Sequence, residues 1–242
     1  MRLLQHRLAG PEACPYLPGL SATTETLVMT GVSPAELERL LERGWRRFGP
    51  VYFRPVCGAC EECVSVRVPV KGFAPSANLR RVEKRCAHLR VEVGQPSVDD
   101  ARLDLYRRWH NGREQERGWK PDRIGAESYA MQFCFPHPSA LELSYWDGAE
   151  LVCVGIADVT PRAISAVYCF HDPGRKALSL GTFNVLQAVR YAREKQLAHV
   201  YLGYRVEECP SLRYKGRFRP QEKLEGRTES DAVPRWSLED AP

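Results

Sequence analysis

Residues 179–206, SLGTFNVLQAVRYAREKQLAHVYLGYRV, decide how this chain is arranged. From about Phe183 to Glu194, apolar side chains recur at helical spacing, so one face of the predicted helix is apolar. The segment from His199 to Val206 is short and rich in aromatic and branched residues, as strands are. The stretch therefore predicts a helix that leads directly into a strand.

Three further strands are predicted upstream of this helix. Leu141 to Trp146 and Leu151 to Val159 flank Asp147-Gly148, a dipeptide that favours a tight hairpin turn. Ala163 to Phe170 follows as the third strand. The order strand, strand, strand, helix, strand predicts an α+β fold with a mixed, mainly antiparallel sheet. This order is similar to that of the GNAT acyltransferases, in which splayed strands beside the late crossover helix accept an acyl donor.

The N-terminal part of the chain predicts a smaller region of helix and strand. Ser33-Pro34-Ala35-Glu36 is a capping box with proline at the first helical position. Val51 to Arg54 and Val64 to Val70 alternate as strands do and bracket three cysteines. A charged helix from Asp100 to Arg117 is broken by Gly118-Trp119-Lys120-Pro121. We therefore expect a cysteine-containing N-terminal α/β domain over residues 1–95 and a GNAT-like transferase domain with a polar C-terminal tail over residues 96–242.

Positive charge is modest in total but concentrated in two places. The chain has 242 residues and a formal net charge of +5, which is less than a protein that coats DNA usually carries. One basic window holds Arg80, Arg81, Lys84, Arg85 and Arg90, and the other holds Arg213, Lys215, Arg217, Arg219 and Lys223. This distribution predicts localised recognition of an anion.

No apolar run in the sequence approaches the roughly 20 residues that a membrane-spanning helix needs. The first seven residues, from Met1 to Arg7, lack the apolar centre of a secretory signal. We therefore expect no membrane partner and a cytoplasmic location. The nine cysteines are then expected to be reduced thiols, metal ligands or small buried residues, not a disulfide framework.

The second basic window follows the strand at residues 199–206. From Tyr201 to Pro220, aromatic and basic side chains recur together, which is typical of a surface that grips a ribose-phosphate end and its bases. The turn from Ser179 to Phe183 contains one glycine and a large ring, whereas coenzyme A enzymes of the GNAT type hold pyrophosphate on a glycine-rich turn. We therefore expect another activated acyl donor, such as an ester on a nucleotide.

Seven short motifs resemble those of the aminoacyl-tRNA–protein transferases. They are Cys14-Pro15-Tyr16-Leu17-Pro18, Gly44-Trp45-Arg46-Arg47, Tyr52-Phe53-Arg54-Pro55, Cys57-x-x-Cys60-x-x-Cys63, Ser179-Leu180-Gly181-Thr182-Phe183, Tyr201-Leu202-Gly203-Tyr204 and Tyr214-Lys215-x-x-Phe218-x-Pro220. The family contains eukaryotic arginyltransferases and bacterial leucyltransferases, which act on proteins that begin with aspartate or glutamate and mark them for the N-degron degradation pathway. The resemblance implies a cysteine-bearing N-terminal domain, a GNAT-like C-terminal domain, and aminoacyl-tRNA and such proteins as partners.

The resemblance to the two branches is mixed. Leu17 and the cysteine triplet are similar to the bacterial leucyltransferases, whereas Cys209-Pro210 and Lys215-Gly216 are similar to the eukaryotic arginyl enzymes. We favour leucine as the transferred residue and keep arginine as the alternative. Phe48 and Arg205 depart from the bacterial pattern, which usually has serine and tryptophan there. Arg205 is therefore expected to affect the choice of acyl group or of acceptor.

The reaction that the family implies is attack on an ester by an amine. The neutral α-amine of the acceptor attacks the carbonyl that joins leucine to the 3′-terminal ribose, and the ribose hydroxyl leaves. Because the ester is already activated, the chemistry requires no cofactor. The protein must align the reactants, accept a proton and stabilise an oxyanion. A weak base suffices, because an α-amine has a pKa of about 8.

Candidate residues for these roles lie in the motifs and at strand ends. We expect Asp158 to orient or deprotonate the amine, and Tyr168 and Tyr204 to donate to the oxyanion or stack on the terminal adenine; a turn cap and buried structural tyrosines are the alternatives. Substrate binding is expected from Gly181, Tyr214, Lys215, Arg217, Arg54, Arg80 and Arg81. The cations among them would bind terminal phosphates or the acidic side chain of the acceptor, since a buried carboxylate needs a partner.

Three thiols within seven residues suit a tetrahedral metal or an iron–sulfur cluster but leave one ligand missing. Cys57, Cys60 and Cys63 form the triplet, and Cys14 is the preferred fourth ligand because it belongs to a family motif, with Cys86 as the alternative. We expect an iron–sulfur cluster or zinc here, with an empty cluster of reduced thiols as the other possibility. The cysteines on apolar strands are expected in the core: Cys134, Cys153 and Cys169.

Two other classes of function are compatible with parts of this pattern. A non-catalytic, zinc-containing protein that binds nucleic acid would use the cysteine triplet and the basic windows but would not need a pocket at Gly181 and Tyr204. An ordinary N-acetyltransferase is disfavoured by the missing pyrophosphate turn.

Overall fold

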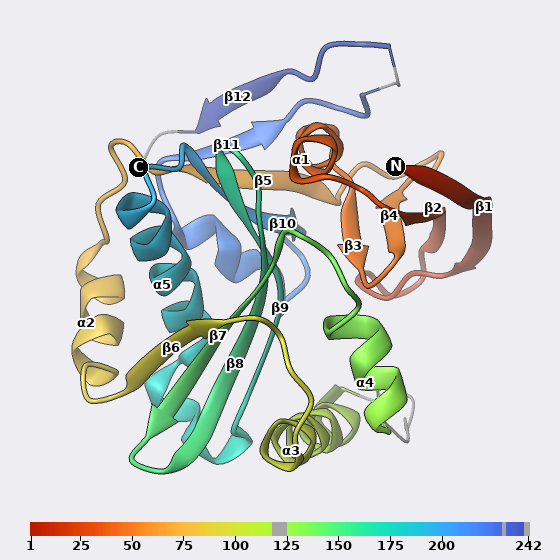
Figure 1. Ribbon diagram of the computed structural model, residues 1–242. Coiled ribbons are helices and arrows are strands. Elements are labelled where there is room, and N and C mark those ends of the chain that lie inside the picture. Colours follow the sequence, from red (N-terminus) through yellow and green to blue (C-terminus); the bar gives the residue numbers. More distant parts are fainter. Residues whose placement is uncertain (118–124, 229–230, 240–242) are drawn as a thin grey trace.

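The computed structural model describes residues 1–117, 125–228 and 231–239. The predicted break at Gly118–Pro121 lies outside the described residues. The described chain forms two sheets, a small one of four strands and a large one of eight, with helices packed against the large sheet (Figure 1). None of the described helices has the length and apolar character needed to cross a bilayer.

The small sheet is antiparallel and has the order β1-β2-β4-β3. Its strands are β1 (Arg2–Ala13), β2 (Ser21–Thr30), β3 (Arg46–Phe48) and β4 (Val51–Pro55). Between β2 and β3 lies helix α1 (Pro34–Glu42), whose predicted capping box is present: the Ser33 hydroxyl accepts from the Glu36 N–H and the Glu36 carboxylate accepts from the Ser33 N–H. After this helix, β3 pairs with β4 in a short antiparallel hairpin.

The large sheet has the order β12-β11-β5-β10-β9-β8-β7-β6. Its strands are β5 (Val64–Pro69), β6 (Arg90–Gly94), β7 (Ala140–Asp147), β8 (Glu150–Val159), β9 (Ala163–His171), β10 (His199–Arg205), β11 (Gln221–Leu224) and β12 (Trp236–Glu239). Among the described strands of this sheet, only β9 and β10 pair in parallel, and the other ladders are antiparallel. The expected mixed, mainly antiparallel α+β arrangement is confirmed.

Strands β9 and β10 separate soon after they meet. Their pairing covers three positions, the last of which joins Tyr201 to Ser165, although β10 continues to Arg205 and β9 to His171. At the same place, the register between β10 and β5 shifts, and Gly203 has a φ of +82°. A bulge with a glycine in this conformation bends a strand. β10 thus turns away from β9, and the two strands splay.

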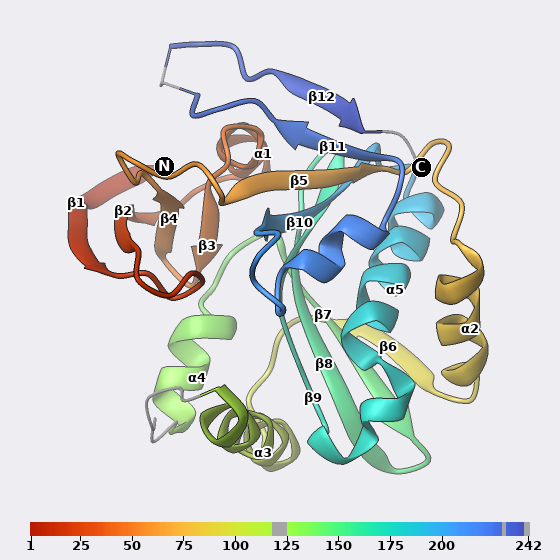
Figure 2. The ribbon, with the colours of Figure 1, turned by 180° about the vertical axis from the view of Figure 1, so that it is seen from behind.

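Helices cover both faces of the large sheet (Figures 1 and 2). Apolar residues of α2 (Ala77–Arg85) and α5 (Leu180–Glu194) join one core cluster. Those of α3 (Asp100–Arg117) and α4 (Ala126–Phe133) join a second cluster. β8 contributes to both, with Val152 in the first and Val154 in the second, as expected of a strand that is buried on both faces. The sheet is therefore the middle layer of three.

The large sheet contains strands from both sides of the predicted domain boundary at residue 95. β5 and β6 precede this boundary, and β5 lies between β10 and β11. The cysteine triplet lies on the connection between β4 of the small sheet and β5 of the large one. The predicted strands on either side of the triplet are confirmed, but they belong to different sheets.

Candidate active site

A cavity of about 650 Å³ opens where β9 and β10 splay. Much of its wall comes from β3, the splayed halves of β9 and β10, the N-terminal end of α5, and the segment after β10. That segment contains a short 3-10 helix, η2 (Arg213–Arg217). The strands of both sheets and the crossover helix therefore meet at one hollow.

The first turn of α5 lines this cavity. Ser179, in the left-handed conformation with a φ of 56°, and Gly181 both line the cavity. A Cβ added to Gly181 would meet no heavy atom within 4 Å, so its backbone stands open to a ligand. The first N–H groups of a helix lack intrahelical partners and carry partial positive charge. This turn can receive an oxyanion or another electron-rich oxygen.

Asp158, at the end of β8, is held in a buried ion pair. Its carboxylate accepts from Arg47 Nε at 2.9 Å and from a terminal nitrogen of the same guanidinium, and its side chain is 1% exposed. Burial raises the pKa of Asp158, and the Arg47 charge acts against this shift. Among the described residues that line the cavity, Asp158 is the only carboxylate. Arg47 bonds both of its oxygens, so the predicted role of Asp158 as a base stays a prediction.

Tyr204 and Lys215 form the wall beside Gly203. The Tyr204 hydroxyl donates to the backbone carbonyl of Gly44 at 2.7 Å and lies 3.3 Å from that of Phe53. Lys215 Nζ donates to the Tyr204 carbonyl at 2.8 Å. Desolvation and the nearby Arg46 guanidinium lower the pKa of Lys215 to about 7. Tyr214, also predicted, lines the same cavity.

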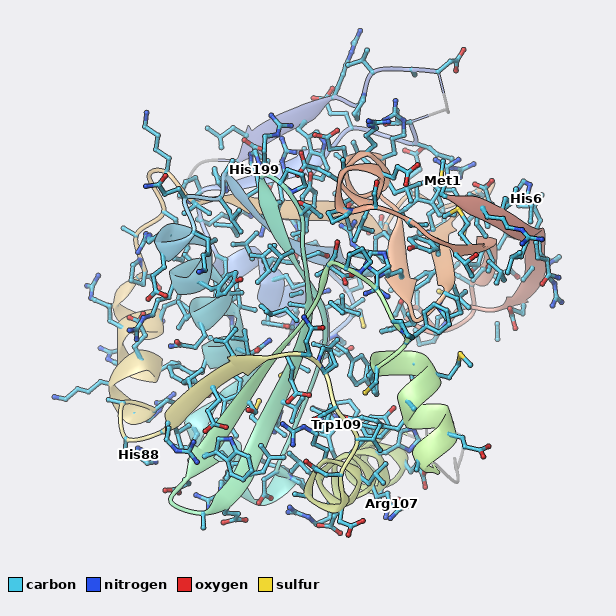
Figure 3. All side chains as sticks on the ribbon, viewed as in Figure 1. Met1, His6, His88, Arg107, Trp109 and His199 are labelled. Carbon is cyan, nitrogen blue, oxygen red and sulfur yellow. The ribbon has the colours of Figure 1, made fainter. Side chains whose placement is uncertain are left out.

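The opposite wall of the cavity is aromatic. The Tyr168 ring packs edge-on against Phe48 and Trp109, with ring centroids 5.7 Å apart in each case. Figure 3 shows Trp109 on α3, between this helix and the sheet. Burial raises the pKa of Tyr168 far above that of a free phenol, so its hydroxyl stays protonated. Phe48, noted as a departure from the bacterial motif, thus becomes part of an apolar surface.

Comparisons with known proteins identify the family of this chain. Two family models cover most of the chain: "Arginine-tRNA-protein transferase, N terminus" matches residues 12–81 and "Arginine-tRNA-protein transferase, C terminus" matches residues 101–225. The chain belongs to the arginine-tRNA-protein transferase family. The predicted resemblance is therefore confirmed, and the family is one of aminoacyltransferases.

Several members of the arginine-tRNA-protein transferase family resemble this chain over nearly its whole length. A protein of Campylobacter jejuni is 33% identical over 90% of this chain and 92% of its own length. Others from Helicobacter hepaticus and Halorhodospira halophila are 31% and 36% identical, over 98% and 88% of this chain and 99% and 91% of their own. All three are named aspartate/glutamate leucyltransferase.

Solved structures resemble the chain more distantly. FemX covers 81% of this chain and 68% of its own, with a TM-score of 0.49 and 8% sequence identity. L-PGS from Bacillus licheniformis covers 60% of this chain and 48% of its own, with a TM-score of 0.43 and 17% identity.

Four cations predicted to bind substrate lie away from the cavity of this family member. Arg80 and Arg81 lie on the exposed face of α2, where they bond Pro75 and Asn78, and Arg217 is exposed on η2. Arg54 is paired with Glu25 at 2.7 Å. The cavity lining does not include any of these four residues. Their substrate-binding roles stay predictions that the geometry does not support.

The Arg205 side chain is held by acidic partners. Its guanidinium forms ion pairs with Glu207 and Glu239, both at 2.7 Å, and the residue is not part of the cavity lining. Arg205 therefore lies outside this cavity, and its effect on the choice of acyl group or of acceptor stays a prediction. Alternation along the strand explains this position, since neighbouring side chains of a strand point to opposite faces.

The four predicted metal-binding cysteines line a second cavity of about 460 Å³. Cys14, Cys57, Cys60 and Cys63 all contribute to it, and Tyr16, Phe53 and Tyr204 separate it from the first cavity. Over residues 1–117, 125–228 and 231–239, no group of three or more His, Cys, Asp or Glu side chains is arranged to hold a metal ion. His6, His88 and His199 lie at distant edges of the molecule (Figure 3). The thiols thus share a cavity without the geometry of a metal site, and a cluster or zinc stays a prediction.

Arg46 also lines the cavity, although its place in a family motif did not assign it a role. It is 7% exposed, and its Nε makes no hydrogen bond. Arg47, the next residue of the motif, is also an arginine, so the sequence alone does not show that the two side chains have different environments. Tyr16, Arg46, Arg47 and Phe53 bring three family motifs of the N-terminal part to the cavity.

Proposed function

We propose that this protein transfers leucine from Leu-tRNA to the N-terminal α-amine of proteins that begin with aspartate or glutamate. The observation that carries this proposal is the single cavity at the splay of β9 and β10. Residues of six family motifs line it, although these motifs lie as far apart in sequence as Tyr16 and Lys215. The relatives named aspartate/glutamate leucyltransferase support the same donor and acceptor.

The charge of the cavity favours leucine over arginine as the transferred residue. Five cations line it: Arg46, Arg47, Arg113, Lys176 and Lys215. Its only described carboxylate, that of Asp158, already accepts two hydrogen bonds from Arg47. An arginyl side chain would therefore meet repulsion without a free acid to bind it, whereas a leucyl side chain suits the aromatic wall of Phe48 and Tyr168.

The same charge suits the other part of the donor. The 3′ end of tRNA carries one negative charge per phosphate, and cations around a hollow raise the local concentration of such a ligand. The Tyr168 ring in the cavity wall, packed against Trp109, offers a surface on which a base can stack. We infer a GNAT-like use of the fold, with the esterified end of the tRNA between the splayed strands.

The reaction exchanges one bond at the carbonyl carbon of leucine. The acceptor nitrogen forms a bond to this carbon, the bond to the ribose oxygen breaks, and the proton lost by the amine ends on that oxygen. N–H groups at the start of α5 can stabilise the oxyanion, since Gly181 leaves them open. The Arg47–Asp158 pair holds β3 against the end of β8 and so fixes the floor of the cavity. Alignment alone can contribute about 7 kcal/mol or more.

One assay tests the proposal against its rivals. Purified protein is mixed with Leu-tRNA, Arg-tRNA or acetyl-coenzyme A and a peptide that begins with Asp or Glu, and the mass of the product is measured. We expect a gain of one leucyl residue. Gain of arginine would establish the arginyl alternative, gain of acetyl would establish an N-acetyltransferase, and tRNA binding without any product would favour the non-catalytic protein.

A further inference from the structure

Arg46 is a buried cation without an acidic partner. Its terminal nitrogens donate to the Trp45 carbonyl at 2.6 Å and to the Ser65 hydroxyl, while Nε is buried and makes no hydrogen bond. The guanidinium lies 5.5 Å and 5.4 Å from the ring centroids of Tyr201 and Tyr204. Within the described part of the chain, no carboxylate forms an ion pair with Arg46.

Other buried or half-buried arginines among the described residues do have such partners. Arg47 is paired with Asp158, Arg67 with Glu222 at 2.5 Å, and Arg205 with Glu239. The fold therefore supplies a carboxylate where an arginine serves only packing. An isolated buried charge is costly, so a protein that keeps one gains from it in the bound state.

Lys215 places a second cation beside the first. A Cβ built on Gly203 would lie 3.4 Å from Lys215 Nζ and 3.7 Å from Arg46 Nε. Both nitrogens thus approach the same point, which stays open because residue 203 has no side chain. Lys215 Nζ donates to the Tyr204 carbonyl and carries further N–H groups beside this one. N–H groups of both Arg46 and Lys215 can therefore donate to the same ligand.

From this geometry we infer that Arg46 and Lys215 bind the side-chain carboxylate of the first residue of the acceptor protein. The inference rests on the proposed function and adds the residues that select the acceptor. The chemistry fits a carboxylate, whose two oxygens accept from the free N–H groups of Lys215 and from Arg46 Nε. An amide side chain of the same shape would turn its NH₂ group toward one of these cations.

The site suits a carboxylate better than a phosphodiester of the tRNA. A phosphodiester continues as a chain on both sides, so it needs a groove that is open at two ends. Arg46, the first residue of β3, is almost completely buried, and the Tyr201 and Tyr204 rings of β10 lie against it. Only a group at the end of a short side chain can reach such a position. Exposed cations of the cavity lining, such as Lys176, suit phosphates better.

Peptide binding in the absence of tRNA tests this inference separately from transfer. Affinity is measured for peptides that differ only in their first residue, Asp against Asn and Glu against Gln, using the full-length protein. We expect the wild-type protein to prefer the acidic peptides by about 10-fold to 100-fold, as charge-assisted hydrogen bonds allow. Lys215→Met should remove most of this preference and leave the affinity for the Asn and Gln peptides within about threefold, as loss of one charged donor implies.

Two further variants make the result specific. Arg213→Met removes an exposed cation of the same 3-10 helix and should leave the preference unchanged. Arg46→Lys keeps the charge but removes Nε, so it should reduce the preference while circular dichroism shows a folded protein. The KM for Leu-tRNA is measured for each variant in the transfer assay.

The outcomes separate the inference from the function on which it rests. If Lys215→Met keeps the preference for Asp over Asn and instead raises the KM for Leu-tRNA, the pair binds a tRNA phosphate and the inference is wrong. Equal wild-type affinity for Asp and Asn peptides would also overturn it. A wild-type protein that binds acidic peptides selectively but never adds leucine would leave the pair assigned and refute the proposed donor.

Discussion

Arg46 and Arg47 are adjacent in β3, yet their side chains lie in opposite electrostatic environments. Arg47 shares its charge with the buried carboxylate of Asp158, while Arg46 faces Gly203 and Lys215. One arginine joins the two sheets and the other is available to a ligand. We therefore expect substitutions of Arg47 to lower the stability of the protein and substitutions of Arg46 to change substrate selection.

Asp158→Asn should destabilise the protein by about 3–5 kcal/mol, because it leaves the Arg47 charge buried without a partner. Urea denaturation of the wild-type and variant proteins measures this loss. Glu194→Gln is the matched control, since it breaks an exposed pair with Arg190 and should cost less than about 1 kcal/mol. A fully stable Asp158→Asn protein without transferase activity would instead return Asp158 to a catalytic role.

His137 should make the stability of the protein depend on pH below neutrality. Its Nδ1 accepts from the Ser139 N–H at 3.1 Å and its Nε2 lies 3.1 Å from the Tyr52 hydroxyl, so the ring is bound in its neutral form. Burial and the Arg47 charge lower the pKa of His137 to about 4. The unfolded chain takes up this proton near its ordinary pKa of about 6.5, so the stabilisation is complete above that pH and lost as the pH falls toward 4.

Thermal or urea unfolding across this pH range measures the effect, with His137→Gln as the comparison. The wild-type protein should lose more stability between pH 6.5 and 4 than the variant does. Parallel curves for the two proteins would show that His137 is not the titrating group.

At the scale of elements, α5 is the part that combines packing with chemistry. Gly181→Ala places a methyl group in open space at the cavity, and alanine is a better helix former than glycine. We expect unchanged or slightly higher thermal stability together with a fall of about tenfold or more in kcat/KM for Leu-tRNA, from loss of access to the N–H groups that stabilise the oxyanion. Unchanged kinetics would exclude this turn as the oxyanion site.

β8 approaches the same helix so closely that only glycine fits at position 155. A Cβ there would overlap the side chain of Asn184, which accepts a hydrogen bond from the Tyr145 hydroxyl at 2.7 Å. Gly155→Ala should therefore cost about 1–3 kcal/mol through overpacking. Gly94→Ala on β6, where a Cβ meets nothing within 4 Å, should be close to neutral in the same unfolding experiment.

Elements with regular apolar spacing could be predicted from the sequence, and others could not. The hairpin of β7 and β8, the strand β10 and the helices α1 and α5 have clear patterns and form as expected. β1 and β2 were not predicted, because β1 is exposed on both faces and so shows no alternation of apolar and polar residues. The basic run on α2 does not distinguish a binding surface from a solvated helix face, because the two have the same composition.

Only part of the site could be predicted from the sequence. Motifs identified Gly181, Tyr204, Tyr214 and Lys215, which the structure brings to one cavity. Whether Arg46 is available to a ligand depends on which carboxylates lie nearby in the fold. Its neighbour Arg47 is paired with Asp158, which is 111 positions away in the chain. Spacing within a motif does not contain that information.

At the scale of the whole molecule, Tyr204 links the two sheets. It lies on β10 of the large sheet, and its hydroxyl donates to Gly44 and is within 3.3 Å of the Phe53 carbonyl on β4 of the small sheet. Tyr204→Phe should cost about 1–3 kcal/mol, because a buried acceptor loses its donor. Urea denaturation checks this value, and single-turnover transfer kinetics check the chemistry. A fall in the chemical rate beyond about 100-fold in a well-folded Tyr204→Phe protein would support its predicted catalytic role.

The position of β5 between β10 and β11 has a consequence for how the protein is made. β5 ends at Pro69, whereas both of its neighbours in the sheet lie beyond residue 198. At about 5–20 residues per second, a ribosome needs on the order of 10–30 s to produce the intervening chain. Throughout that interval β5 has neither partner, and its backbone groups are open to incorrect pairing. Newly made chains should therefore depend on chaperones until the last strands emerge.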